Sequence, residues 1–259
     1  MKSPLEKAHK NPESMNSQAL LDMMTIQLEK AHKNPESMKA RILAAARRIF
    51  GEYGFHGTTT RMIASEVGID ISTLHYHWGD KNDLYEAVVM DVNNDLGREL
   101  LKVEKIVHGS SMEERLKVSI DKMMDYLFDH PEVSNLILLR HFSKTRNEVD
   151  VDFKVPEFSG DIARAMGLTK DVKNPSPRVM MEVMSIMNGM HSFVSGENYF
   201  RPMLKLDRKN YIRTVKETLK FILIPAFVLY EGKTKKGGNS PRTPLTPKKK
   251  KSPTNSNGG

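Results

Sequence analysis

The sequence contains no cysteine. This absence excludes thiolate-ligated metal sites and a disulfide framework, and it fits a reducing compartment. Long hydrophobic runs are missing as well, because the longest apolar stretch, Phe221–Tyr230, has ten residues and is interrupted by Pro225. Such a stretch is too short to span a bilayer. The charged N-terminus also lacks the apolar core of a secretory signal. We therefore expect a cytoplasmic protein without membrane contact.

Sequence signatures of catalysis are also missing. There is no HExxH, no glycine-rich phosphate loop and no Gly-x-Ser-x-Gly. His75 and His77 stand two positions apart, about 200° around a helix, so they cannot chelate one ion there. Asp121, Asp125 and Asp129 follow an i, i+4, i+8 spacing that is typical of a solvated helix face. We therefore expect no enzyme activity, no metal and no cofactor.

Acidic residues are absent from the C-terminal end of the chain. Residues 233–259 contain seven lysines and one arginine, which equal the whole net charge of +8. With several prolines and almost no apolar residue, residues 232–259 are predicted to form a disordered basic tail. Such a tail binds polyanions through counterion release. The alternative is a solubilising tail without a partner.

The N-terminal extension, residues 1–37, contains a duplication. The segment LEKAHKNPESM occurs at Leu5–Met15 and again at Leu28–Met38, a shift of 23 residues. In each copy, Asn-Pro-Glu-Ser is typical of a helix start, with proline in the first turn. The first copy is predicted to start a short extra helix through Leu20, Leu21 and Met24. No function follows from the repeat itself.

The strongest pattern lies between residues 38 and 84. An amphipathic helix over residues 39–50 is expected to break at the glycines that follow, Gly51, Gly54 and Gly57. A short helix then ends at Gly68, and Asp70 can cap the next helix. That third helix, residues 71–77, is unusually polar. Two short helices at a tight turn, the second carrying hydrogen-bonding side chains, are typical of a DNA-reading helix-turn-helix.

These residues resemble the DNA-binding domain of the TetR family of bacterial transcriptional regulators. The resemblance is carried by Thr58–Thr60, Ile63-Ala64, Val67–Ile69, Thr73-Leu74, Tyr76-His77, Lys81 and Leu84. The family usually has Gly, Tyr and Phe where this chain has Ser72, His75 and Trp78. The resemblance implies an all-α fold, with a helix-turn-helix DNA-binding domain over residues 38–84 and a larger helical effector-binding and dimerisation domain over residues 85–231.

Candidate DNA-binding residues follow from the polar helix and its neighbours. We expect Ser72, Thr73 and Tyr76 to face base edges, and Ile71 to touch a thymine methyl group. His75 and Lys81 are expected to meet phosphates. The complete set of candidates is Thr58, Thr59, Thr60, Arg61, Ile71, Ser72, Thr73, His75, Tyr76, His77 and Lys81.

Beyond residue 84 the chain is predicted to be helical without a sheet, with a polar loop over Asn147–Gly160. The methionine-rich stretch around Met180–Met190 is apolar on more than one face, which favours a homodimer partner as well as a core. Methionine also suits an adaptable, largely apolar pocket for a small-molecule effector. The candidate pocket residues are Met124, Phe128, His141, Met184, Met187 and His191.

The sequence as a whole favours a ligand-responsive transcriptional repressor that binds a palindromic operator in double-stranded DNA as a homodimer. Two alternatives stay open. One is a nucleoid-associated or architectural protein whose tail dominates non-specific DNA binding. The other is a ligand-binding interaction module without a DNA role.

Overall fold

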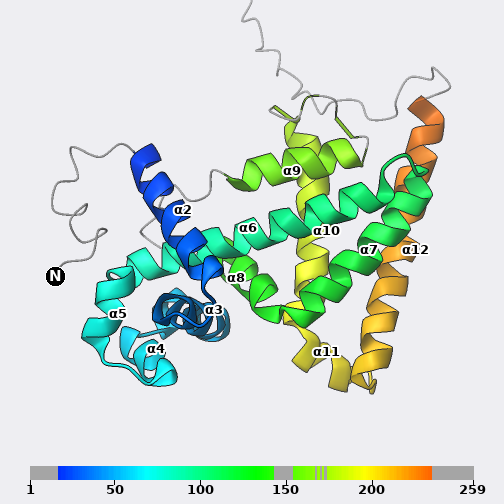
Figure 1. Ribbon diagram of the computed structural model, residues 1–259. Helices are drawn as coiled ribbons and strands as arrows, with labels where there is room; N and C mark the ends of the chain where they lie inside the picture. Colours follow the sequence, from blue (N-terminus) through cyan, green and yellow to red (C-terminus); the bar gives the residue numbers. More distant parts are fainter. Residues whose placement is uncertain (1–16, 143–153, 167, 170, 172–173, 235–259) are drawn as a thin grey trace, which may run out of the picture.

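The computed structural model describes residues 17–142, 154–166, 168, 169, 171 and 174–234, and within them it contains α-helices and no strand (Figure 1). The predicted all-α fold is confirmed. The helices are α2 (Ser17–Lys33), α3 (Met38–Gly57), α4 (Thr60–Val67), α5 (Ile71–Trp78), α6 (Lys81–Val107), α7 (Met112–Asp129), α8 (Pro131–Phe142), α9 (Lys154–Ala165), α10 (Pro177–Ser195), α11 (Glu197–Met203) and α12 (Arg208–Thr234). None of the described helices combines the length and apolarity that crossing a membrane requires.

The head of the molecule consists of α3, α4 and α5, which lie together at one end of α6 (Figure 1). Each short helix is capped by its own neighbours in sequence. The Thr59 hydroxyl accepts a hydrogen bond from the Met62 N–H, and Gly68 closes α4 in the left-handed conformation at φ 76°. The Asp70 carboxylate accepts from the Thr73 N–H and starts α5. Local sequence therefore sets both ends of the turn.

The glycines at the end of α3 behave differently from the sequence prediction. The helix continues through Gly51, and only Gly54 leaves the helical region, at φ 68° and ψ 177°. Gly51 is needed for a different reason: a Cβ there would lie 2.8 Å from the Cβ of Glu132 on α8. The absence of a side chain lets α3 and α8 approach closely, so Gly51 is a packing residue rather than a helix breaker.

The larger part of the molecule consists of α6 to α12. The predicted loop Asn147–Gly160 was wrong at its C-terminal end, because α9 begins at Lys154. Ala163 of this helix is fully buried against Val179 and Val183 of α10. Packing against α10 thus makes part of a polar segment helical. The rest of the predicted loop, up to residue 153, lies outside the described residues.

The acidic stripe on α7 is exposed, as predicted, and it also pairs with α12. Asp121 accepts from the Lys220 ammonium of α12 at 2.6 Å, and Asp125 pairs with Lys216 of the same helix. Asp121 and Asp125 therefore form part of the α7–α12 contact while their side chains stay 41% and 57% exposed.

The N-terminal extension provides a helix that packs into the core. Met24, Leu28 and Ala31 of α2 are buried in the same apolar cluster as α3 and α6. The His32 Nε2 atom lies 2.7 Å from the Asp91 carboxylate of α6. The second copy of the duplicated segment contributes Leu28, Ala31 and His32 to these contacts. It therefore packs against the head and α6.

Arg47 joins the head to the larger part of the molecule. Its guanidinium, on α3, lies 3.0 Å from Asp91 and 3.1 Å from Glu132, and it also pairs with Asp95. The side chain is only 13% exposed. Burial lowers the pKa of Arg47, but the hydrogen bond and charge of Asp95, with the charges of Asp91 and Glu132, outweigh it and raise the pKa overall. One buried cation thus bridges α3, α6 and α8.

Candidate DNA-binding site

The outward side of α4 and α5 carries most of the predicted DNA-binding residues. Arg61, Ser72 and Tyr76 are exposed, whereas Ile71 and Thr73 are half-buried. The Tyr76 ring is 52% exposed although Leu74, two residues earlier, is fully buried. The helix therefore buries one face in the head and presents the other, with its polar side chains, to solvent.

The hydroxyl groups at the start of α5 are held by one carboxylate. Ser72 Oγ donates to Asp70, and Thr73 Oγ1 donates to the same side chain at 3.1 Å. Hydrogen bonds from the Ser72 hydroxyl, and then from Thr73, hold the pKa of Asp70 below its usual range. Both hydroxyl protons are thus engaged, and the oxygen lone pairs remain available to donors on the base edges.

Thr58 is the clearest correction to the predicted set. Its side chain is fully buried, and its hydroxyl donates to the Gly54 carbonyl at 2.8 Å. The side chain thus fastens the turn between α3 and α4 and cannot reach DNA. Thr59 and Thr60 stay exposed and half-buried, although the Thr59 hydroxyl serves as the α4 cap.

The histidines of α5 have different surroundings. The His75 Nδ1 atom lies 2.7 Å from the Gly79 carbonyl, so this nitrogen carries the proton and donates to the helix end. His77 is half-buried, and burial followed by the charge of Lys39 lowers its pKa. Lys81 lies over the Phe55 ring at 4.3 Å, and burial lowers its pKa. His75 and His77 are thus half-buried residues of α5, and Lys81 is a half-buried residue at the start of α6.

Sequence reasoning did not select Lys39. Its ammonium lies 4.7 Å from the centre of the Trp78 ring, and its carbonyl accepts from the Trp78 indole N–H at 3.0 Å. Burial, followed by the charge of Lys30, lowers the pKa of Lys39 to about 8. The signal was present as a lysine at the start of the amphipathic helix, but the sequence could not show that α5 ends against it.

The predicted effector residues do not converge on one cavity. Met124 and Phe128 are buried in the main apolar core, and Met184 is partly exposed on α10. His191 is buried, with its Nδ1 atom 3.0 Å from the Ser134 hydroxyl. Met187 packs against two smaller apolar clusters. The side chain of His141 lies outside the described residues.

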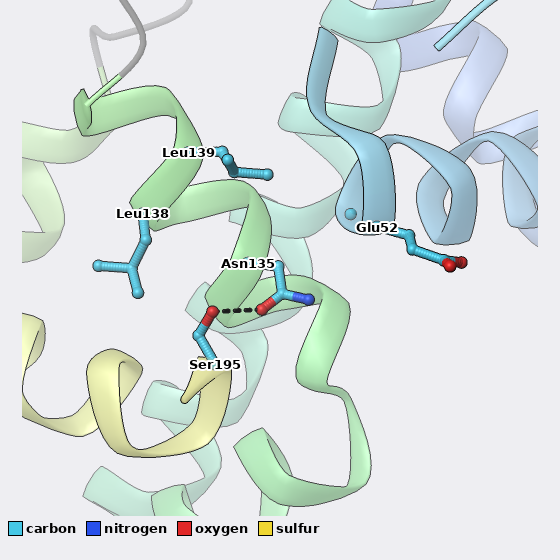
Figure 2. A pocket seen from close by; sticks show the side chains of 6 residues that line it. Glu52, Asn135, Leu138, Leu139 and Ser195 are labelled. Atoms are coloured by element: carbon cyan, nitrogen blue, oxygen red, sulfur yellow. Dashed lines mark hydrogen bonds between the residues drawn. The ribbon is translucent and has the colours of Figure 1, made fainter. Parts of the chain in front are cut away.

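A pocket of about 340 Å³ lies instead where the head meets the larger part of the molecule (Figure 2). It is lined by Gly51, Glu52, Asn135, Leu138, Leu139 and Ser195. The Ser195 hydroxyl donates to the Asn135 side chain at 2.5 Å, whereas Glu52 points away from this pair in Figure 2. The five effector candidates whose side chains the structure describes do not line this pocket.

Comparisons with known proteins fit this architecture. Residues 42–88 match the profile of the bacterial regulatory proteins of the tetR family. The transcriptional regulator BetI of Escherichia coli is 28% identical over 95 residues, which cover 37% of this chain and 47% of BetI. The transcriptional dual regulator CecR of Shigella flexneri is 39% identical over 59 residues, which cover 23% of this chain and 26% of CecR. The chain thus spans about half, or less, of the length of these curated relatives.

Solved structures extend the likeness of fold to the larger helices. A TetR-like transcriptional regulator from Rhodococcus sp. RHA1 has a TM-score of 0.50 at 16% identity, covering 70% of this chain and 92% of that chain. A tetR family protein from Shewanella sp. PV-4 has a TM-score of 0.52 at 15% identity, covering 71% and 96%. Fold and site define a helix-turn-helix protein with a larger helical domain. Residues 42–88 match the DNA-binding domain of the tetR family of bacterial regulatory proteins.

Proposed function

We propose that this chain is a cytoplasmic, ligand-responsive transcriptional regulator, acting as a repressor that binds a palindromic operator as a homodimer. The observation that carries the proposal is the capped α4–α5 pair, in which α4 exposes Arg61 and α5 exposes Ser72 and Tyr76 while its other face is buried. A helix of this kind enters the major groove, and a dimer places two of them about 34 Å apart on successive turns of DNA.

Apolar side chains exposed on the last long helices support the dimer. Met181 and Met184 are exposed on α10, and Phe221 and Ile222 on α12, where Phe221 is 80% exposed. Both helices pack against α7 (Figure 1). Large apolar residues exposed on these two helices favour burial against a second copy.

Replacing Phe221 by Glu is expected to shift the protein from dimer to monomer, because a carboxylate would be desolvated in the interface. Sedimentation velocity at several protein concentrations measures the change. Lys122→Glu, on an exposed position of α7, is the matched control and should leave the dimer intact. A Phe221→Glu protein that sediments like the wild type would rule out this surface as the dimer contact.

The larger domain is proposed to take a largely apolar effector. The methionines of α10 support this, since they are flexible and polarisable. An effector acts only if it binds one head orientation more tightly than another. Arg47 and Gly51 of α3 contact α6 and α8, so a movement of α6 or α8 on effector binding would shift α3 directly.

The test of the function is selection of bound sequences from a pool of random duplexes, followed by affinity measurements on the selected duplex and on random DNA. Tyr76→Ala should cost about 1–3 kcal/mol on the selected duplex and far less on random DNA. Tyr53 is a matched control, because it is 51% exposed in the head but lies on α3. Tyr53→Ala should leave both affinities unchanged. Equal losses on both DNAs for Tyr76→Ala would refute base reading, and recovery of no preferred sequence would favour an architectural protein.

A further inference from the structure

Lys39 contacts α2 and α5 at positions next to two further basic residues: it donates to Gln27, one helical turn before Lys30, and lies over the ring of Trp78, which follows His77. Lys39 begins α3, Lys30 lies on α2, and His77 lies on α5. Lys39 ties the group together: its ammonium donates to Gln27 of α2 and lies 4.7 Å from the centre of the Trp78 ring. The charge of Lys30 acts on Lys39, and the charge of Lys39 acts on His77.

The group has no acidic partner in the described part of the chain. The ion pairs found there join other lysines and histidines to carboxylates, as in the pairing of Lys33 with Glu29 one turn along α2. Burial and then Lys30 lower the pKa of Lys39 to about 8, and burial and then Lys39 lower the pKa of His77. Adjacent cations that disfavour one another are stabilised by an anion that lies between them.

The position of the group identifies the anion. His77 lies four residues after Thr73, so the two share one face of α5. Tyr76, next to His77, is an exposed candidate for base reading. A major-groove helix is flanked along its length by phosphates of the DNA backbone, and lysine is a common ligand for them.

We propose that Lys30, Lys39 and His77 form a binding site for a DNA backbone phosphate, through which the N-terminal extension helix takes part in DNA binding. The proposal rests on the proposed DNA-binding function. It assigns a task to the second copy of the duplicated segment, which contributes Lys30 and whose buried residues Leu28 and Ala31 hold α2 in place.

The test uses the full-length protein and a fluorescently labelled random-sequence duplex, with anisotropy measured at several KCl concentrations. Lys30→Gln and Lys39→Met should each weaken binding several-fold. The double variant should reduce the slope of log affinity against log salt by about 0.9 for each phosphate that the protein no longer neutralises. Lys33→Gln is the matched control, since it removes one positive charge from the same helix at a side chain that is 79% exposed and paired with Glu29.

The outcomes separate the site from the general function. Suppose that the wild-type protein binds DNA and that Lys30→Gln and Lys39→Met give the same slope of log affinity against log salt as Lys33→Gln. This result would overturn the phosphate site and leave the proposed function standing. A wild-type protein without salt-dependent DNA binding would overturn both. Circular dichroism checks the fold, and because Lys30 is exposed, Lys30→Gln decides the matter if Lys39→Met does not fold.

Discussion

Replacing Arg47 by Met is expected to lower the free energy of unfolding by about 3–5 kcal/mol, the cost typical of removing one partner from a buried ion pair. Methionine keeps an apolar stem of similar length but leaves the carboxylates of Asp91, Asp95 and Glu132 close together. Asp91 is only 4% exposed, so water cannot replace the guanidinium. The His32 imidazole, which also lies beside Asp91, is charged only when protonated.

Arg48 is the matched control for this prediction, because it is the next residue of α3 and its side chain is 60% exposed. It pairs with Glu66, and exposed pairs contribute about 0–1 kcal/mol. Urea unfolding of Arg47→Met and Arg48→Met, followed by circular dichroism, gives both free energies. If the two variants were destabilised equally, Arg47 would not be the residue that joins the head to α6 and α8.

Deletion of residues 235–259 is expected to weaken binding to the selected duplex and to random DNA alike. The deletion removes six lysines and Arg242, which carry seven positive charges. It starts after Thr234 because α12 extends to that residue, past Lys233, the first lysine of the predicted tail. A tail with few apolar groups contacts phosphates rather than bases, so the specificity ratio should stay constant or rise.

The salt dependence measures the contribution of the tail directly. The slope of log affinity against log salt should fall by about 0.9 for each phosphate that the tail neutralises in the full-length protein. The control is a full-length variant with the same seven residues changed to Gln, which should behave like the deletion if charge is responsible. An unchanged slope would make the tail a solubilising segment, whereas weaker binding confined to the selected duplex would show that it reads sequence.

Much of the head could be predicted because its signals are local. Gly68, Asp70 and Asp80 cap helices through backbone groups within a few residues of themselves. These helix ends can therefore be predicted without knowledge of any tertiary contact. The buried face of α5, with Leu74 and Trp78, likewise follows from helical spacing. The same reasoning correctly predicted that α2 would exist, but not that it would pack into the core.

Most of what the sequence could not show comes from contacts between residues far apart in the chain. Thr58 is a different case: it was selected as a DNA-binding candidate, yet its side chain is buried and its hydroxyl donates to the Gly54 carbonyl four residues earlier. The pairing of Asp121 and Asp125 could not be predicted, because α12 brings Lys220 and Lys216 beside them from far along the chain. The effector residues were chosen by type and helix face, and burial placed Met124 and Phe128 in the core instead of in a pocket.

Sequence alone therefore determined the all-helical class, the helix-turn-helix and its polar third helix, because helix periodicity and capping depend on neighbours along the chain. Only the tertiary structure decided which of the polar and charged side chains remain available. It buried Thr58, joined α3, α6 and α8 through Arg47, and placed Lys39 between Gln27 of α2 and Trp78 at the end of α5. The physical reason is that burial and charge pairing depend on which helices pack together, and that packing is set by residues far apart in the sequence.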